Sequence, residues 1–397
     1  MFSRKLVFII MLMLALANPA SAIQYKGDLE ANESLILPEQ SAKPANPSSG
    51  KRKLYFKDDG APYSLDSAGN ENPIDRAGFK NYLINGGFRL WQRGTSFTVS
   101  GVYTADRWKQ NHNTAGATYS RQAFTLGQTD VPGEPKYFMR VNVTSAAVST
   151  SSVLRHRIED VRTLAGQVAT LSFWARCDSP KTFTITLSQT FGTGGSPSTP
   201  VTVVSSNRSI GTSWARYTVT VDINSLTGKA IGTNGDDYLE VHLLEVASFS
   251  TFTLDLAQFQ LEQGSIATEF EKRPLGLELA LAQRYFEKSF SLNTNPGEGQ
   301  PNPPYLSVMT ITTTARRGWL PFVTRKRASP TMTYYRAAGM TNDGYWNVRE
   351  GESAWTERAP STNNASEDGV VVQVVAVGAV AGQGMAAQGH WAADAEL

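Results

Sequence analysis

Three tryptophans of the sequence each lie next to or near an arginine, and this pairing is the first candidate for ligand-binding chemistry. A flat aromatic ring can hold the apolar side of a sugar ring, and a guanidinium can hydrogen-bond its hydroxyls. Each tryptophan could instead pack inside a β-sandwich, because aromatic side chains dominate such interiors. The pairs are Trp108 with Arg107, Trp174 with Arg176, and Trp214 with Arg216.

Trp174 is the leading candidate because it lies in a clear strand pattern. Leu171, Phe173 and Ala175 alternate with Ser172, Trp174 and Arg176. Successive residues of a strand point to opposite faces. We therefore expect the three apolar side chains in the core and Trp174 and Arg176 together on the outer face.

The sequence lacks the common signatures of catalysis and of metal or redox chemistry. It has no GxSxG, no P-loop and no GxGxxG between a strand and a helix. Its acidic pairs, Glu159-Asp160 and Asp236-Asp237, are typical of solvated turns. The four histidines show no HxH or HExxH spacing, and Cys177 is the only cysteine, so no zinc site or disulfide is indicated. We expect no enzyme, no catalytic residue and no cofactor.

Composition favours an all-β protein of more than one domain. The chain has 397 residues, and single cores rarely grow beyond roughly 250 residues. Its 33 glycines and 19 prolines, with abundant Thr, Ser and Val, favour short strands joined by turns. The net charge of +2 gives no basis for a nucleic-acid partner.

The N-terminal segment Met1–Ala22 has the three-part pattern of a secretory signal peptide. Arg4 and Lys5 precede an apolar run, and small residues occupy positions 20 and 22. This pattern predicts export with cleavage after Ala22. No later segment is apolar and long enough to span a membrane, so we expect no membrane span in the mature chain.

Residues 23–78 are predicted to form an extended arm and a β-hairpin. The polar, proline-containing stretch 31–50 is typical of a linker. Asp59-Gly60 between short apolar alternations predicts a hairpin in which Leu54 and Phe56 face Tyr63 and Leu65. Two strands alone are barely stable, so this hairpin should pack against another chain or the next domain.

Residues 79–290 are predicted to form an antiparallel β-sandwich of the jelly-roll type, since apolar alternation recurs between turns without helical crossovers. In Phe252–Lys288 the alternation slips by one residue after Leu256, which indicates a bulge. From Pro274 onward the pattern becomes helical, with Leu277, Leu281 and Tyr285 on one side. The expected strands contain Leu171–Ala175, Phe183–Leu187, Tyr217–Ile223 and Leu239–Leu243, and the stretch 192–200 is expected to be a loop.

Residues 291–397 are predicted to form a C-terminal β domain, because the Pro- and Gly-rich stretch 293–305 near its start marks a boundary. The run Val370–Val380 is apolar on both faces, so we expect it to be buried between layers or between subunits. The expected strands are 306–313, 318–324, 331–335, 345–349 and 370–380.

Three separated blocks resemble the domain of many bacteriophage tail-fibre and receptor-binding proteins. They are NYLINGGFRLWQRGTSF at 81–97, YTADRW at 103–108, and QLEQGSIATEFEKRP at 260–274 followed by ELALAQRYFEK at 278–288. The stretch 44–60 is similar to tail-fibre N-terminal arms, and HWAADAEL at 390–397 is similar to tail-fibre C-termini. Family members often carry Cys at the position of Ala282.

The resemblance implies a virion appendage with a carbohydrate-binding, galactose-binding-like jelly roll, other tail proteins as partners, and a homotrimeric assembly. It also implies adhesion to cell-surface polysaccharide or lipopolysaccharide. By residue type, the candidate ligand-binding residues are Trp174, Arg176, Trp108, Trp214 and Arg216. NGGF at 85–88 with Asp255 looks like the calcium corner of such jelly rolls, which makes Asn85 and Asp255 weak candidates for structural calcium. Arg89 opposes a cation there, and Asp255 could instead cap a turn or pair with Arg89.

Two alternatives remain open. Met1–Ala22 is not expected of a phage structural protein and favours an exported, prophage-derived carbohydrate-binding protein. A capsule depolymerase is the third interpretation. The location is accordingly the virion tail fibre or, alternatively, the extracytoplasmic space.

Overall fold

The structure is a computed structural model with two compact units, Met1–Arg76 and Ala77–Leu397. Among the described residues strands predominate, with a single helix, so the all-β prediction is confirmed. None of these residues belongs to a helix long and apolar enough to cross a membrane. The structure describes residues 9–10, 27–28, 39–57, 62–69, 71–73, 79–112, 116–145, 151–246, 251–297, 303–310, 315–336, 344–350, 355–375 and 384–397.

In the first unit the predicted hairpin is present, but its faces differ from the prediction. Tyr55 lies opposite Tyr63, with their ring centroids 5.9 Å apart, whereas Leu54 is 56% exposed. The two tyrosines and Leu65 form the buried side, because aromatic pairs cover more area than Leu54 could. The sheet order is β3 (Glu39–Gln40), β4 (Lys53–Lys57), β5 (Pro62–Leu65) and β6 (Glu71–Pro73).

The predicted turn Asp59-Gly60 lies outside the described residues. So does the signal-peptide-like segment, apart from β1 (Ile9–Ile10), which pairs with β2 (Gly27–Asp28).

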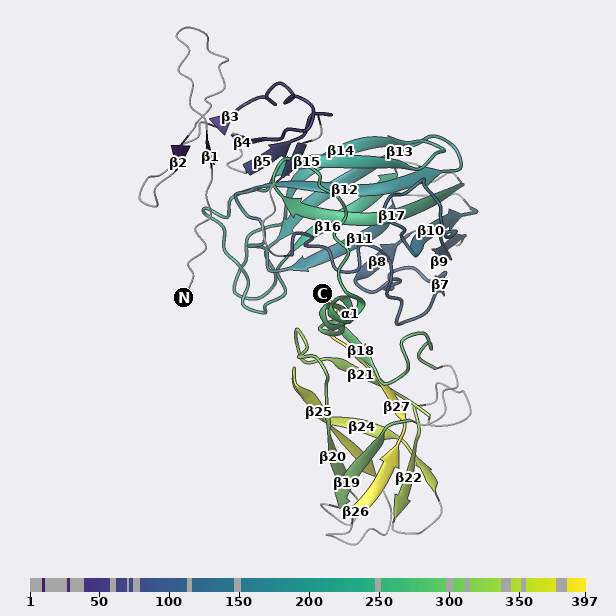
Figure 1. The fold of residues 1–397 in the computed structure, drawn as a ribbon. Helices are drawn as coiled ribbons and strands as arrows, with labels where there is room; N and C mark the ends of the chain where they lie inside the picture. Colours follow the sequence, from purple (N-terminus) through teal and green to yellow (C-terminus); the bar gives the residue numbers. More distant parts are fainter. Residues whose placement is uncertain are drawn as a thin grey trace, which may run out of the picture. The chain divides into compact units, whose positions relative to one another are not determined.

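The second unit begins with the predicted antiparallel β-sandwich, whose two sheets enclose one apolar core (Figure 1). One sheet has the order β15 (Ala215–Asp222), β12 (Val168–Cys177), β17 (Phe252–Gln263), β10 (Tyr137–Val143), β9 (Ala117–Ala123) and β7 (Ser96–Phe97). The other has the order β14 (Val201–Ile210), β13 (Lys181–Thr190), β16 (Tyr238–Val246), β11 (Ser151–Glu159) and β8 (Trp108–Asn111).

The core follows the alternation seen in the sequence. Leu171, Phe173 and Ala175 of β12 are fully buried, as are the apolar residues of β13 that face them across the sandwich. Ser172 is also buried, whereas Trp174 and Arg176 on the same outer face are only half-buried. The prediction for the two faces of this strand is confirmed.

The predicted slip in β17 is a bulge. Ser172 lies opposite Gln260, but Trp174 lies opposite Ala257, so one extra residue is inserted in β17. Gln258 takes it up with φ of 50°, a left-handed conformation that is uncommon for a residue with a side chain. As a result Leu254 and Leu256 before the bulge and Phe259 and Leu261 after it all reach the core.

The predicted joining helix is α1 (Leu275–Gln283), and it is shorter than the sequence pattern suggested. Pro274 precedes it as the N-cap, with ψ of 140°, and Tyr285 lies beyond its end. The buried residues of the helix are Glu278 and Ala282, not the leucines at 277 and 281. The periodicity failed because the Glu278 carboxylate accepts a hydrogen bond from the Asn85 amide, which draws that side inward.

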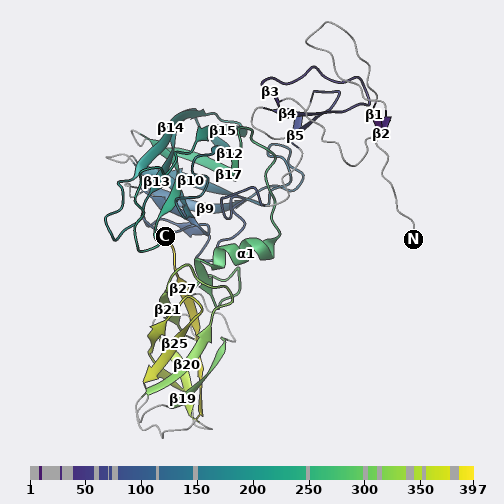
Figure 2. The same ribbon diagram turned by 90° about the vertical axis from the view of Figure 1, so that its left-hand side faces the viewer.

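The chain ends in two further antiparallel sheets, shown from a second direction in Figure 2. A three-stranded sheet has the order β18 (Phe286–Lys288), β27 (His390–Asp394) and β21 (Thr331–Tyr335). A seven-stranded sheet has the order β23 (Thr356–Arg358), β22 (Trp346–Glu350), β26 (Gly384–Gln388), β19 (Tyr305–Thr310), β20 (Ala315–Pro321), β25 (Gly369–Val375) and β24 (Pro360–Ala365).

These sheets have their own core, separate from that of the sandwich, to which β25 contributes Val370, Val372 and Val374. Val375 is 51% exposed, so the described part of the run 370–380 buries mainly one face. Residues 376–380 lie outside the described residues. After β27 the chain returns to the sandwich, where the Tyr103 hydroxyl donates to the Leu397 carbonyl oxygen at 2.8 Å.

Candidate ligand-binding groove

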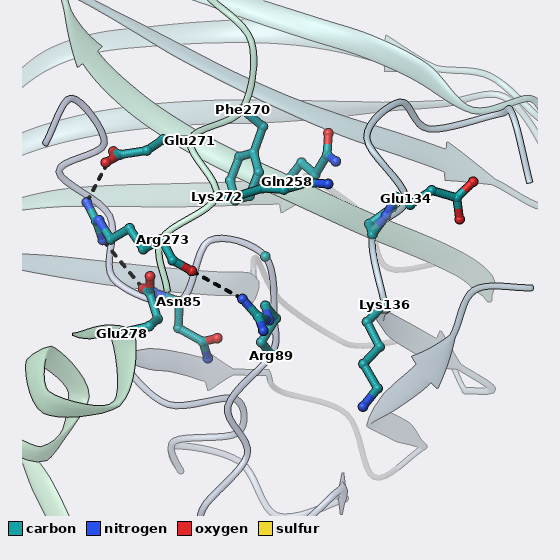
Figure 3. Close-up of a pocket in the computed structure, with 12 residues that line it drawn as sticks. Asn85, Arg89, Glu134, Lys136, Gln258, Phe270, Glu271, Lys272, Arg273 and Glu278 are labelled. Carbon is teal, nitrogen blue, oxygen red and sulfur yellow. Dashed lines mark hydrogen bonds and ion pairs between the residues drawn. The ribbon is translucent and has the colours of Figure 1, made fainter. Parts of the chain in front are cut away.

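Two adjoining cavities lie on the outer face of the six-stranded sheet. The first cavity has a volume of about 420 Å³ and contains Trp174 and Arg216 in its lining. The second cavity, of about 240 Å³, is shown in Figure 3. Because both are lined by Gln258, Phe270 and Lys272, we treat them as one groove. Its size falls in the range of about 300–1,000 Å³ of small-ligand pockets.

The β17 bulge supplies the centre of the groove. Because Gln258 is the inserted residue, its side chain leaves the core side and enters the groove, where it is 4% exposed. Its amide Nε2 donates to the Pro132 carbonyl oxygen at 2.7 Å. This bond holds the loop between β9 and β10 against the sheet, where Pro132 and Gly133 form one wall.

The opposite wall is the segment that follows β17. Gly264, with φ of 108°, allows the chain to turn there, and residues 265–273 then return across the outer face. Gln260 holds this segment at two points, since its Nε2 donates to the Glu269 carbonyl oxygen at 3.1 Å and its Oε1 accepts from the Glu271 amide at 2.7 Å. Phe270 and Lys272 are positioned in the groove by these bonds.

The fold brings together Trp174 and Arg216, which are two of the candidate ligand-binding residues predicted from the sequence. Arg216 lies opposite Trp174 on β15 and donates to the Ser172 hydroxyl at 3.0 Å and to the Thr268 carbonyl oxygen. Partial burial lowers the pKa of Arg216, and the charges of Glu262 and Glu269 act in the opposite direction. None of the described residues accepts a hydrogen bond from the Trp174 indole N–H.

Arg176 and Trp214 lie together, but they do not line the groove. The Arg176 guanidinium is 5.1 Å from the centre of the Trp214 ring, and its Nε donates to Asp255 Oδ2 at 2.9 Å. Arg140 binds the same carboxylate through two bonds, of 2.7 and 2.8 Å. Trp214 also packs against Phe124 and Phe138, so this cluster stabilises the sheet surface.

Trp108 is in the core, so the expectation that it binds a ligand does not hold. Its ring is fully buried against Phe88, His156 and Phe259, and no face is open. Its indole N–H donates to the Asn85 carbonyl oxygen at 3.0 Å. Its sequence neighbour Arg107 is also buried, in contact with Glu396.

Asn85 and Asp255 do not fit the calcium site suggested for them. The side-chain Nδ2 of Asn85 donates to the Leu90 and Asp106 carbonyl oxygens at 2.8 and 3.1 Å, and its Oδ1 accepts from the Leu90 backbone amide. Asp255 is bound by two arginines and lines another cavity, and Arg89 is not one of its partners. Calcium needs six or more converging oxygens, and the described residues include no group of three or more His, Cys, Asp or Glu able to hold a metal.

The second cavity has one wall built around the buried Arg273. Its guanidinium lies 3.4 Å from the Glu278 carboxylate and 3.7 Å from that of Glu271 (Figure 3). It also donates to the Leu83 and Asn81 carbonyl oxygens. Burial raises the pKa of Glu278, although the Asn85 amide and Arg273 oppose that change. This wall is a structural anchor with its charges internally paired.

The groove can bind a ligand rich in hydroxyls. Trp174 and Phe270 offer half-buried aromatic surface, and Gln258, Arg216 and Lys272 offer hydrogen-bonding groups beside it. Gln258, Phe270 and Lys272 were not among the residues expected from the sequence. For Gln258 the sequence held one signal, the slip in alternation after Leu256, which marks position 258 as irregular. Phe270 and Lys272 lie in a segment without periodicity, so the sequence held no such signal for them.

No protein-family model matches the chain, and no curated protein matches it. Structures with similar strand arrangements include a Bacteroides thetaiotaomicron protein whose name describes sugar binding, with 16% identity, covering 47% of this chain and 100% of that one, at a TM-score of 0.32.

Two further structures have lower TM-scores. A family 11 carbohydrate-binding module of Clostridium thermocellum, in complex with a mixed-linked tetrasaccharide, has 9% identity, 44% and 98% coverage, and a TM-score of 0.26. The enzymatically active domain of bacteriophage CBA120 tailspike protein 4 has 14% identity, 46% and 21% coverage, and a TM-score of 0.29. All these values are low, so the fold described here rests on this chain's own strand pairing.

Proposed function

We propose that this protein is a non-enzymatic tail-fibre or receptor-binding protein that adheres to host cell-surface glycans through the groove. The observation that carries this proposal is the placement of Trp174 and Phe270 beside Gln258, Arg216 and Lys272 in one open cavity. Aromatic surface binds the apolar side of a pyranose, and amide and cationic groups orient its hydroxyls. The resemblance of the blocks at 81–97, 103–108 and 260–288 to tail-fibre proteins supports the virion role.

A binding assay on a glycan array tests the groove. Trp174→Ala should weaken binding by about tenfold or more, equivalent to about 1.4 kcal/mol, with little change in melting temperature because the ring is only half-buried. Trp214→Ala is the matched control, since its ring packs outside the groove; it should lower the melting temperature and retain binding. Equal binding by wild type and Trp174→Ala would contradict the proposal.

The alternative is an exported, prophage-derived carbohydrate-binding protein, which Met1–Ala22 supports. Mature protein that begins at Ile23 outside the bacterial cytoplasm would favour this alternative, and intact protein in purified phage particles would favour the tail fibre. A depolymerase would have to release reducing ends from surface polysaccharide and lose that activity when a groove carboxylate such as Glu269 is changed to Gln.

We also propose a homotrimer, which the resemblance to tail-fibre proteins supports. Light scattering of the full chain tests this assembly, and a monomeric mass would count against it.

A further inference from the structure

We propose that the glycan carries an anionic substituent, a carboxylate or a phosphate, that binds in the second cavity to Arg89, Lys136 and Lys272. This inference rests on the proposed function, because it concerns the chemistry of the ligand in the same groove. It assigns the two cavities different tasks: the first binds the sugar ring and the second binds the charge.

Of the four cations that line the second cavity, Arg89, Lys136 and Lys272 are exposed and form no ion pair with a described carboxylate, although the charge of Arg89 also acts on Glu278. Arg89 donates only to the Arg273 carbonyl oxygen, at 3.2 Å. The Lys136 ammonium lies 5.1 Å from the centre of the Tyr137 ring, and Lys272 makes no hydrogen bond or ion pair with a described residue. Three positive charges around one cavity attract an anion and repel each other until it binds.

The carboxylates that line the same cavity are held by protein groups. Glu271 accepts from the Lys80 and Asn81 amides at 3.1 and 2.7 Å. Glu278 accepts from the Asn85 amide, and both carboxylates contact Arg273. Glu134 accepts from the Gly127 amide at 3.3 Å, and Figure 3 shows its carboxylate pointing away from the hollow. The acidic groups are thus turned to the walls.

Figure 3 shows how the cations are distributed. Lys136 lies on the wall that belongs to the β9–β10 loop, and Arg89 lies across the hollow from it, below Lys272 and Phe270. An anionic group between these walls can accept hydrogen bonds from more than one direction, and a guanidinium can bind a carboxylate or phosphate in bidentate fashion.

The charged residues that line the first cavity are Arg216, Lys272 and Glu269. Its exposed carboxylate, Glu269, interacts electrostatically with Arg216, which faces the same cavity. Lys272 lies at the boundary and lines both cavities. A ligand that spans both would therefore place a neutral ring against Trp174 and its charged substituent beyond Phe270.

The test uses the full chain on an array of bacterial surface polysaccharides. Each polymer is printed in three forms: native, carboxyl-reduced, and dephosphorylated with hydrogen fluoride. We expect strong binding to native acidic polymers, a loss of about tenfold or more in one treated form, and no effect of the other treatment. The affected treatment identifies the anion as carboxylate or phosphate.

Variants assign the effect to the cavity. The affinity of Arg89→Gln and of Lys136→Gln for native acidic polymers should be as low as the affinity of wild type for the treated form that it binds weakly. Lys229→Gln, an exposed lysine that lines neither cavity, is the matched control and should bind as wild type. If neither treatment changed the binding of wild type, and Trp174→Ala still lost binding, this inference would be overturned and the proposed function would remain intact. Absence of binding to any polymer would overturn both.

Discussion

Arginines and lysines lie both in the groove and at the junction between the sandwich and the C-terminal sheets, but their charges are balanced differently. At the junction, Glu396 contacts Arg107 and lies 3.2 Å from Arg93, and all three side chains are largely buried. Arg93 also lies 3.1 Å from Asp394. In the groove, Arg89, Lys136 and Lys272 are exposed and form no ion pair with a described carboxylate.

The difference shows which cations serve folding and which are available to a ligand. A buried charge must be paired within the protein, because desolvation otherwise costs several kcal/mol. An exposed charge in a cavity carries no such requirement and can keep its interactions for an incoming partner. The comparison predicts opposite responses to mutation in the two regions.

The largest expected effect is at the junction. Glu396→Ala leaves Arg107, whose side chain is 1% exposed, without its carboxylate, and removing one partner of a buried pair typically costs about 3–5 kcal/mol. Urea denaturation measures this loss of unfolding free energy. Glu367→Ala, which breaks the exposed pair with Arg325, is the control and should change the unfolding free energy far less. Equal losses in the two variants would mean that the junction is not a buried ion pair.

The next effect concerns the groove wall. A Cβ at Gly86 would overlap the Phe259 carbonyl oxygen beside the bulge, so Gly86→Ala should cost about 1–3 kcal/mol as the loop moves away. At Gly87 the nearest atom to a Cβ is a Phe270 ring carbon at 3.4 Å, an ordinary contact. Gly87→Ala is therefore the matched control. If thermal unfolding showed that Gly87→Ala destabilises the protein more than Gly86→Ala, this explanation of the wall would be wrong.

A smaller effect depends on pH. Burial alone would raise the pKa of Glu240, but hydrogen bonds from His242 and Arg157 outweigh it and lower the pKa to about 2, from 4.5. Because the folded-state pKa is the lower one, this stabilisation is complete above pH 4.5 and is lost as pH falls toward 2. Between pH 5 and pH 2.5, wild type should lose unfolding free energy on the order of 1–2 kcal/mol through this group. Glu240→Gln should not show this loss. Identical pH profiles for wild type and variant would exclude this contribution.

The smallest expected effect is that of a groove cation on stability. Lys136→Gln should change the unfolding free energy by no more than about 0.5 kcal/mol, because the side chain is exposed and has no carboxylate partner among the described residues. A loss comparable to that of Glu396→Ala would show that Lys136 serves folding and would remove the distinction between the two regions.

The sandwich could be predicted because its information is local. Alternation in β12 placed Leu171, Phe173 and Ala175 in the core and Trp174 outside, and the slip after Leu256 located the bulge. The hairpin in the first unit was found, and Tyr63 and Leu65 are buried as expected. In its first strand Tyr55 is buried instead of Leu54, since short alternations leave the choice of buried side to packing.

The groove walls could not be predicted, because their positions depend on contacts between distant residues. Pro132 is held by Gln258, and Phe270 is placed by Gln260, in segments that have no periodicity of their own. Trp108 was misjudged for the same reason, since the distant residues His156 and Phe259 cover its ring. Sequence spacing identifies a residue's strand face but not what covers that face.

The anchoring of Arg273 has a mechanical consequence. This residue separates the groove wall, residues 265–272, from helix α1, and it is bound to the Asn81 and Leu83 carbonyl oxygens as well as to Glu278. A pull on a ligand held at Phe270 is therefore borne first by β17 and the 81–83 segment of the sandwich. Because Glu278 belongs to α1, the Arg273 anchor joins the groove wall both to this segment and to the helix.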